Sequence, residues 1–400
     1  MNNIRNNKNF KIMMICSGIL VTTPVSVLFY QAYGIAFEQI MIIKTATFIS
    51  TIIFEVPSGY IADRFGYKKI IQAGLICLIL SCIGNITFHS IFAFISWGII
   101  WGIGNALLSG ADEAWYYNFL KEQDMESEYG NNISQILAAI QFISAIALIL
   151  SSAIFVMDER LPYIFNTFFF AIALGASFRL SEKKEKRKDK STERLHNISV
   201  WKVLNANNIF FVLAEVVFVA VIIFTFEMYQ PQMTECNIPV STFGLIYFCF
   251  TILTGFGSRA YGMVKNKKGE IQFNLKNYFA LLSMQGITLL CLCFGPDNMV
   301  IMLILMCIQE FLYGVFNVYS NAAINSKTDN SYRATLISIK SLLTCGSKSL
   351  LFLVAGKIMD LFYLKMTYLF LAVILLCSCI LLGGTRSIYL AIKSKEKHTI

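Results

Sequence analysis

The stretch that decides the fold is FEVPSGYIADRFGYKKII, residues 54–71. Apolar chain runs directly into an Asp-Arg pair, a glycine and two lysines, and then becomes apolar again. A charged turn between two long hydrophobic segments is typical of a chain that crosses a bilayer, turns among the headgroups and crosses back. This stretch therefore predicts further membrane spans elsewhere in the chain.

The composition places the whole chain in a membrane. Of its 400 residues, 56% are hydrophobic and 14% are charged, and the mean hydropathy is +0.62. A soluble protein of this length carries about a quarter of its residues as charged side chains. Apolar runs of about 20 residues recur along the sequence, far longer than the alternating ten-residue strands of an outer-membrane barrel. The sequence predicts an all-α polytopic membrane protein.

Hydropathy and charge divide the chain into two similar halves. A polar segment, RLSEKKEKRKDKSTERLHN at residues 179–197, is too charged to form a core. We therefore predict a six-helix bundle over residues 1–180, a cytoplasmic linker over 181–207, and a second six-helix bundle with a short tail over 208–400. The twelve predicted spans are 10–33, 39–61, 70–89, 91–117, 132–156, 161–180, 208–229, 241–263, 277–294, 298–319, 333–356 and 366–384.

Lysine and arginine fix the predicted orientation. Most of the 33 basic residues fall in the two tails, the central linker and the loops on the same side. Because positive charge is retained in the cytoplasm, both termini and the linker are predicted to be cytoplasmic. The net charge of +9 then reports topology, and no nucleic-acid partner is implied. The basic linker is either a plain solvated loop or a segment that touches anionic lipid headgroups.

Motifs for enzymes, metals and nucleotides are missing from the sequence. There is no G-x-x-x-x-G-K-[ST] loop for ATP, and the 11 cysteines show no metal-ligand spacing. The basic, apolar start MNNIRNNKNFKIMMICSGIL continues past residue 30 without a cleavage site, so we interpret it as the first span. The sequence predicts a protein that is not an enzyme and has no cofactor or metal.

The charged turn has a spacing that serves a specific geometry. Glycines permit a sharp turn and close helix approach, a carboxylate is favoured where orphan N–H groups point, and the cations reach headgroups or acidic partners. The turn reads G-x-x-x-D-R-x-G-x-K-K, with Gly59, Asp63, Arg64, Gly66, Lys68 and Lys69 at its fixed positions.

This turn resembles the signature loop of the major facilitator superfamily, which lies between spans two and three of twelve. The resemblance implies the major facilitator fold and alternating access, with the loop latching the two halves together at the start of span eleven, near Arg333. The alternative is that the charges only mark a cytoplasmic turn. The chain departs from the family at Tyr67, where a basic residue is usual.

Three further segments resemble a bacterial branch of short, exporter-type facilitators: FEVPSGYIADR, SGADEAWYYNFL and SYRATLISIKS. The resemblance implies export and places Asp112 and Glu113 at an inner gate with Arg64 or Arg333. The chain has Asn118 where the branch has Asp. The buried Arg and the Gly-Pro pair of drug/proton antiporters are missing from spans four and five.

Charges inside the predicted spans are candidate functional groups, because each costs at least a few kcal/mol. Glu310 lies near the middle of span ten and Glu215 about a third of the way into span seven. Lys340 and Lys348 are about 80° apart on span eleven and can face one cavity. We predict Glu310 as the proton-coupling site, with Glu215 as the second candidate and Lys348 as the modulating cation. The alternative is a structural Glu–Lys pair.

The lining of the substrate cavity is predicted from polar and aromatic residues on spans one, four and ten, which line the cavity in the family. An amide that faces lipid is costly, which favours an inward face for Asn105 and its helical stripe. The alternative for this stripe is that its aromatic side chains face lipid or pack against other helices. The candidates are Gln31, Trp101, Asn105 and Asn317.

Together these features predict a secondary carrier in a bacterial cytoplasmic membrane. The predicted activity is proton-coupled export of a small amphiphilic molecule, such as a drug, antibiotic or peptide-like metabolite, by a monomeric antiporter. One alternative is an uptake carrier or uncoupled facilitator for a small polar nutrient. Another is a receptor-like membrane protein, which the latch motif disfavours because a latch serves halves that move.

Overall fold

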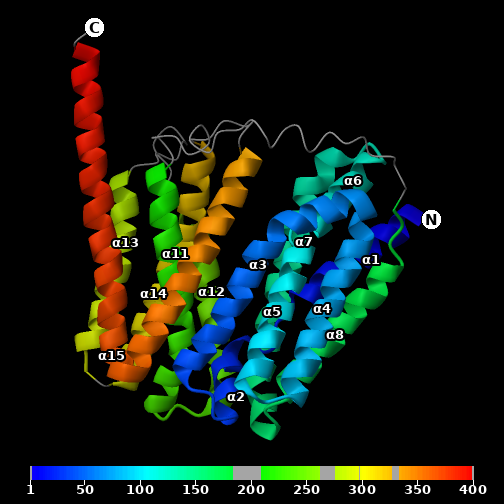
Figure 1. Cartoon of the computed structure of the whole chain (residues 1–400), viewed down its shortest axis with the longest axis horizontal. Helices are drawn as coiled ribbons and strands as arrows, with labels where there is room; N and C mark the ends of the chain where they lie inside the picture. Colours follow the sequence, from blue (N-terminus) through cyan, green and yellow to red (C-terminus); the bar gives the residue numbers. More distant parts are fainter. Residues whose placement is uncertain (1, 183–208, 262–274, 297, 327–332, 399–400) are drawn as a thin grey trace. The chain divides into compact units, whose positions relative to one another are not determined.

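The computed structural model describes residues 2–182, 209–261, 275–296, 298–326 and 333–398. Within these ranges every regular element is an α-helix or a short 3-10 helix. Eleven helical stretches there are long and apolar enough to cross a membrane. The predicted all-α membrane architecture is confirmed (Figure 1).

The chain forms two units. Unit 1 comprises Met1–Asp189 and Ile238–Phe248, and unit 2 comprises Lys190–Asn237 and Cys249–Ile400. The segment Ile238–Phe248 is tied to unit 1 through Ser152, whose hydroxyl donates to the Ser241 carbonyl (2.8 Å). Most of the predicted linker, residues 183–207, lies outside the described residues.

Unit 1 is built on close helix packing. Helix α3 packs on α5, α4 packs on α5 and α8, and α1 packs on α8 and α7. A Cβ at Gly102 would lie 2.3 Å from the Thr47 carbonyl oxygen, so this glycine is required where α5 meets α3. The helices of this unit are α1 Asn2–Gly18, α2 Ser26–Ala32, α3 Phe37–Phe65, α4 Tyr67–Thr87, α5 Ile91–Leu108, α6 Ala111–Lys121, α7 Tyr129–Met157 and α8 Leu161–Phe178, with 3-10 turns η1 Thr23–Val25, η2 Glu126–Glu128 and η3 Val240–Thr242.

The first span, predicted as one helix over 10–33, is broken in the structure. Helix α1 ends at Gly18, the short η1 turn follows, and α2 begins at Ser26. Pro24 stands inside η1, where its missing N–H and fixed φ are tolerated. The break lies within a stretch of 28 residues that is apolar enough to span the membrane.

Side chains of α7 and α8 satisfy the backbone that this break exposes. Asn166 Oδ1 accepts from the Val21 N–H (2.7 Å), and its amide donates to Thr22 Oγ1 (3.1 Å). Ser151 donates to the Val21 carbonyl, and Ser144 donates to the last carbonyl of α1 (3.3 Å). Irregular backbone at membrane depth is tolerated only where protein groups or water satisfy it. The polar residues of α7 and α8 thus make the break possible.

The fourth predicted span, 91–117, is divided in its C-terminal half. Gly110 has φ 77° and separates α5 from α6. Glycine adopts this left-handed conformation at no steric cost, so the sequence places the turn here.

Unit 2 contains α11 Ile209–Glu235, most of α12 Phe243–Tyr261, α13 Leu275–Phe294, α14 Met299–Ser326 and α15 Arg333–His398. Helix α15 is interrupted at Tyr363, whose φ is 63° and ψ is −177°. Figure 1 shows its two segments, orange and red, running in opposite directions from this point. The reversal falls between the predicted spans 333–356 and 366–384.

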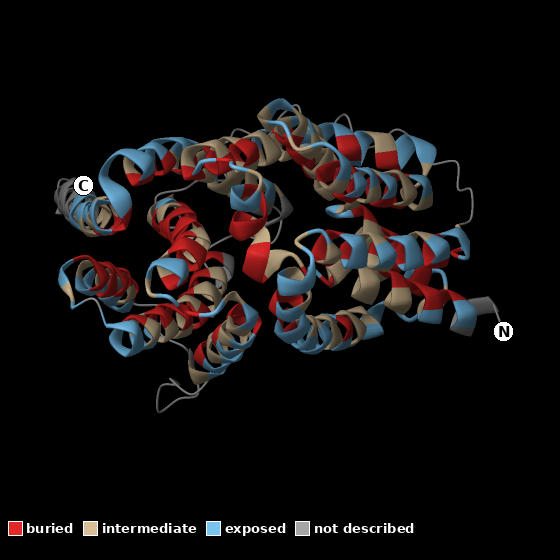
Figure 2. Ribbon diagram, turned by 90° about the horizontal axis from the view of Figure 1, so that it is seen from below, coloured by how far each residue is buried: buried red, intermediate tan, exposed pale blue. Residues whose placement is uncertain are grey.

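Burial follows the pattern of a protein that faces lipid. Large apolar side chains lie on the outside, such as Phe92 at 79% exposed and Leu350 at 70%, whereas Asn166, Gln285 and Gln309 are fully buried. In Figure 2 the buried residues, drawn red, lie mainly on helix faces that turn toward other helices of the same unit. Polar groups inside and apolar groups outside are the arrangement that a bilayer favours.

Candidate functional site

The charged turn of the opening motif binds the end of α8. Gly66, with φ 95°, joins α3 to α4. The carboxylate of Glu182 accepts hydrogen bonds from the backbone N–H groups of Tyr67 and Lys68, both at 3.0 Å. These are two of the orphan donors at the start of α4, and a carboxylate is favoured there. Glu182 therefore caps α4 from a residue just after α8.

Lysine and tyrosine complete this contact. Lys68 Nζ donates to the carbonyls of Phe178 (2.9 Å) and Leu180 (2.6 Å), where the C-terminal end of a helix attracts a cation. Tyr67 donates to Asp63 Oδ1 (2.7 Å), so the residue that departs from the family pattern holds the motif aspartate. We call this set, Asp63, Gly66, Tyr67, Lys68 and Glu182, the α4 clamp.

The α4 clamp does not include the predicted latch residues Gly59 and Arg64. A Cβ at Gly59 would meet no atom within 4 Å, and the Arg64 guanidinium lies 5.7 Å from the Phe65 ring centroid. The side chain of Arg333 lies outside the described residues, so its predicted contact with the loop stays a prediction. Sequence reasoning missed Glu182, although it is the first carboxylate after the sixth span; the basic linker around it hid this signal.

The predicted gate acids, Asp112 and Glu113, lie in the first turn of helix α6. Asp112 Oδ1 accepts from the N–H of Glu113 (2.7 Å), and Tyr129 donates to Glu113 Oε2 (3.4 Å). Acids in the first turn stabilise a helix N-terminus. This explains their local position after Gly110, and their predicted role in a gate remains a prediction.

A largely buried ion pair joins two helices of unit 2. Lys340 Nζ of α15 lies 2.9 Å from Glu215 Oε1 of α11 and donates to Asn321 Oδ1 (2.7 Å). The other oxygen, Glu215 Oε2, accepts from Ser320 (2.6 Å), whose hydroxyl also bonds to Tyr278 (2.9 Å). Both carboxylate oxygens are therefore paired, and the charge of Glu215 is compensated.

The ion pair continues along α14. Asn321 donates to Asn317 Oδ1 (2.9 Å), and Tyr278 is also tied to the Phe211 carbonyl (3.0 Å). Three predicted site residues, Glu215, Lys340 and Asn317, are thus brought into one network, which we call the Glu215 network. The sequence analysis predicted that Lys340 and Lys348 can face one cavity, and the structure shows Lys340 paired with Glu215.

Glu310 has a different environment. It is 4% exposed on α14, its Oε2 accepts from Thr254 of α12 (3.1 Å), and its Oε1 is buried without a hydrogen-bond partner. An ion pair with Lys348, the predicted modulating cation, is not among the contacts of this carboxylate in the described part of the chain, and the modulating role stays a prediction. The two buried acids therefore differ: Glu215 is compensated, and Glu310 has one unpaired oxygen.

A row of neutral polar side chains adjoins Glu310. Tyr229 of α11 donates to Gln309 Oε1 (2.8 Å), and Gln309 Nε2 donates to Thr288 Oγ1 of α13 (3.3 Å). Gln285 lies one turn before Thr288 in α13 and is fully buried. This row contains none of the predicted site residues, although Gln309 directly precedes Glu310 in the sequence.

The predicted cavity residues of unit 1 lie apart along its helices. Gln31 is exposed near the end of α2, and Trp101 packs edge-on against Phe170 of α8, with ring centroids 5.7 Å apart. Asn105, one turn after Trp101, is partly buried. Helix packing, the alternative weighed for the aromatic stripe, accounts for the Trp101 contact.

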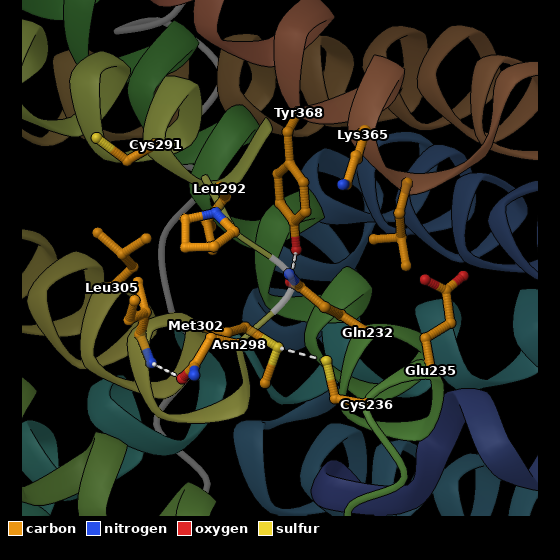
Figure 3. Close-up of a pocket in the computed structure, with 13 residues that line it drawn as sticks. Gln232, Glu235, Cys236, Cys291, Leu292, Asn298, Met302, Leu305, Lys365 and Tyr368 are labelled. Carbon is orange, nitrogen blue, oxygen red and sulfur yellow. Dashed lines mark hydrogen bonds between the residues drawn. The ribbon is translucent and has the colours of Figure 1, made fainter. Parts of the chain in front are cut away.

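A cavity of about 60 Å³ lies among helix ends of unit 2. Figure 3 shows Tyr368 bonded to Gln232, and the sulfur atoms of Cys236 and Met302 are 3.4 Å apart. Small-molecule sites usually occupy about 300–1,000 Å³, so this cavity fits a few water molecules. The predicted site residues are not in its lining.

The fold and these buried charges define a class. Ionisable side chains that face the interior of a membrane helix bundle, and pair between helices there, are typical of transporters. The sequence profile of the Major Facilitator Superfamily matches residues 12–275. The chain belongs to this superfamily, and it is a membrane transporter and not an enzyme.

Two relatives from bacteria support this assignment. The chain is 23% identical over 374 residues to the uncharacterized MFS-type transporter YxaM of Bacillus subtilis (strain 168), covering 90% of each protein. It is 34% identical over 79 residues to the uncharacterized transporter BU466 of Buchnera aphidicola subsp. Acyrthosiphon pisum (strain APS), covering 19% of each.

Solved structures share the fold. The chain resembles the nucleoside transporter NupG with a TM-score of 0.75 and 12% identity, covering 96% of this chain and 98% of NupG. For a D-xylose-proton symporter the values are 0.70 and 11%, covering 96% and 97%. For the POT family transporter PepTSo they are 0.71 and 12%, covering 97% and 98%. At these identities the likeness shows the fold alone.

Proposed function

We propose that this protein is a proton-coupled secondary transporter that exports a small amphiphilic molecule by alternating access. In this proposal twelve helices cross a bacterial cytoplasmic membrane, with the reversal at Tyr363 separating the last two. A straight helix of the 45-residue apolar stretch Ser338–Leu382 would be about 68 Å long, roughly twice the hydrocarbon thickness. Both termini are cytoplasmic, and the monomer is the working unit.

The observation that carries the proton coupling is the unpaired oxygen of Glu310. An uncompensated carboxylate away from water costs several kcal/mol, whereas the neutral acid does not. Glu310 therefore holds a proton while it is enclosed as in this structure, and releases the proton when an alternate conformation admits water. A group whose charge depends on the conformation is the requirement for proton-driven transport.

The Glu215 network supports a charged substrate. Lys340 is held by two acceptors, Glu215 and Asn321. An incoming carboxylate or phosphate competes with Glu215 for this ammonium group, and a protonated amine competes with Lys340 for Glu215. Lys348, on the same helix, adds a second cation. Mixed charge of this kind favours a zwitterion or anion over a purely cationic drug.

The α4 clamp holds the charged turn between α3 and α4 in place, and the proposal assigns this turn to the latch. In the proposal, Gly59, Asp63, Arg64, Gly66 and Lys68 latch the two bundles. Asp112, Glu113 and Arg333 form the inner gate, and Gln31, Trp101, Asn105 and Asn317 line the substrate path.

Transport in proteoliposomes tests the function. Purified protein would be reconstituted with an imposed pH gradient, and a panel of amphiphilic antibiotics and dipeptides would be followed across the membrane. Accumulation of a compound against its gradient on the acidic side supports antiport. Accumulation on the alkaline side identifies a symporter, and equilibration independent of the gradient identifies an uncoupled facilitator. Either of the last two results contradicts the proposal.

A further inference from the structure

Gln285 is an unusual residue in the core of unit 2. It is 0% exposed, and it alone among the described residues has both side-chain polar atoms buried without a hydrogen-bond partner. Buried amides in native proteins are nearly always bonded, because leaving donor and acceptor unpaired costs free energy. A site around this amide therefore calls for a ligand that both donates and accepts.

The neighbours of Gln285 are already hydrogen-bonded to one another. Thr288 is three residues further along α13, and side chains at this spacing have Cβ atoms about 5–6 Å apart on one helix face. Its hydroxyl donates to the backbone carbonyl of Gln285 (2.8 Å) and accepts from the Gln309 side chain (3.3 Å). Gln309 in turn accepts from Tyr229 (2.8 Å). A polar row thus runs from Thr288 of α13, one turn from the unpaired amide, to Gln309 of α14 and Tyr229 of α11.

The far end of this row adjoins Glu310. Glu310 follows Gln309 in α14, and the Tyr229 hydroxyl neighbours its carboxyl group. Glu310 Oε1 is buried without a partner, as are both polar atoms of Gln285. A side chain with unused hydrogen-bonding capacity therefore lies next to each end of the row.

We propose that Gln285 binds a small cluster of buried water molecules, which extends the Tyr229–Gln309–Thr288 row and gives the Glu310 carboxyl a route for its proton. Water satisfies an amide donor and an amide acceptor together, whereas a metal cation satisfies only the oxygen. A buried water makes about three hydrogen bonds, and the amide, Thr288 and neighbouring waters supply them. The route rests on the proposed coupling role of Glu310.

Protons are conserved along this route. A proton that leaves the carboxyl moves onto an adjacent water or hydroxyl, which passes one of its own protons to the next group. One proton leaves at the far end, and every intermediate group is restored. The amides of Gln285 and Gln309 orient the water molecules and do not carry the proton, so in the proposal a water of the cluster passes the proton between the hydroxyls of Tyr229 and Thr288, which Gln309 separates.

The test uses full-length protein in detergent, with Gln285→Leu as the main variant and Gln285→Met as a second one in case the first folds poorly. Gln72→Leu is the matched control, because Gln72 is a glutamine of unit 1 whose Nε2 is also buried without a partner. Glu310→Gln identifies the signal. Proton release after a rapid jump from acidic to alkaline pH is followed with a fluorescent pH dye, and Tm is measured for each protein.

The proposal predicts that the phase abolished by Glu310→Gln is at least tenfold slower in both Gln285 variants and unchanged in Gln72→Leu. It also predicts that Tm falls in the Gln285 variants, because the waters lose their anchor. An unchanged rate, or a higher Tm from removal of an unbonded amide, overturns it. If wild type lacks the Glu310-dependent phase, the proposed function fails and the route fails with it; the Tm change then decides the water site alone.

Discussion

Buried polar side chains have different partners in the two units. In unit 1, Asn166, Ser151 and Ser144 bond to the backbone of a broken helix. In unit 2, Ser320 and Asn321 bond to the ionisable Glu215 and Lys340. Unit 1 uses its polar groups to shape the backbone, whereas unit 2 uses them to hold charge. The proposed proton chemistry therefore belongs to unit 2, and the stabilisation of the helix break belongs to unit 1.

The largest effect is expected from removing one partner of the ion pair. Lys340→Met leaves Glu215 buried without its cation, and breaking a buried pair in this way costs about 3–5 kcal/mol. We expect a large loss of Tm in detergent. The double variant Lys340→Met/Glu215→Gln should recover most of it, since no unpaired charge remains. A double variant as unstable as the single one would show that the pair is not the cause.

The next effect is expected at the broken span of unit 1. Asn166→Leu removes the acceptor of the Val21 N–H and the donor to Thr22. An unsatisfied buried backbone group costs about 1–3 kcal/mol, so chemical or thermal unfolding should show a loss in this range. Ser144→Ala, which removes one longer bond, should cost less. Equal, negligible effects in both variants would remove the assigned role of α7 and α8.

A smaller effect is expected at the α4 clamp. Glu182→Ala removes the carboxylate from the start of α4, a contribution of about 0.3–1 kcal/mol for a helix terminus. Gly66→Ala places a Cβ 2.9 Å from Glu182 Oε2 on a backbone of φ 95°, which adds strain of about 1–3 kcal/mol. Combining the two changes should cost less than the sum, because the clash partner is gone. Full additivity of the two Tm losses would contradict the contact.

The sequence predicted features that depend on hydropathy and missed those that depend on helix rotation. Run length located the spans, and residue counting placed Glu310 deep in one of them. The rotation of α15 about its axis decides that Lys340 contacts Glu215. The spacing of Lys340 and Lys348 places them about 80° apart on the helix, and this angle alone does not show which of the two contacts the acid. The break after Gly18 was missed because Thr22, Thr23 and Pro24 stand inside an otherwise apolar run. Its stabilising residues are about 120 or more positions away.

The most direct test of the account asks which buried acid carries the proton. Proton release on raising the pH would be compared for wild type, Glu310→Gln and the charge-neutral double variant Glu215→Gln/Lys340→Met, all purified in the same detergent. The account predicts that Glu310→Gln loses one proton per molecule from the release, while the double variant retains it. Loss of the proton in the double variant, with full release from Glu310→Gln, would assign coupling to the Glu215 network and contradict the account.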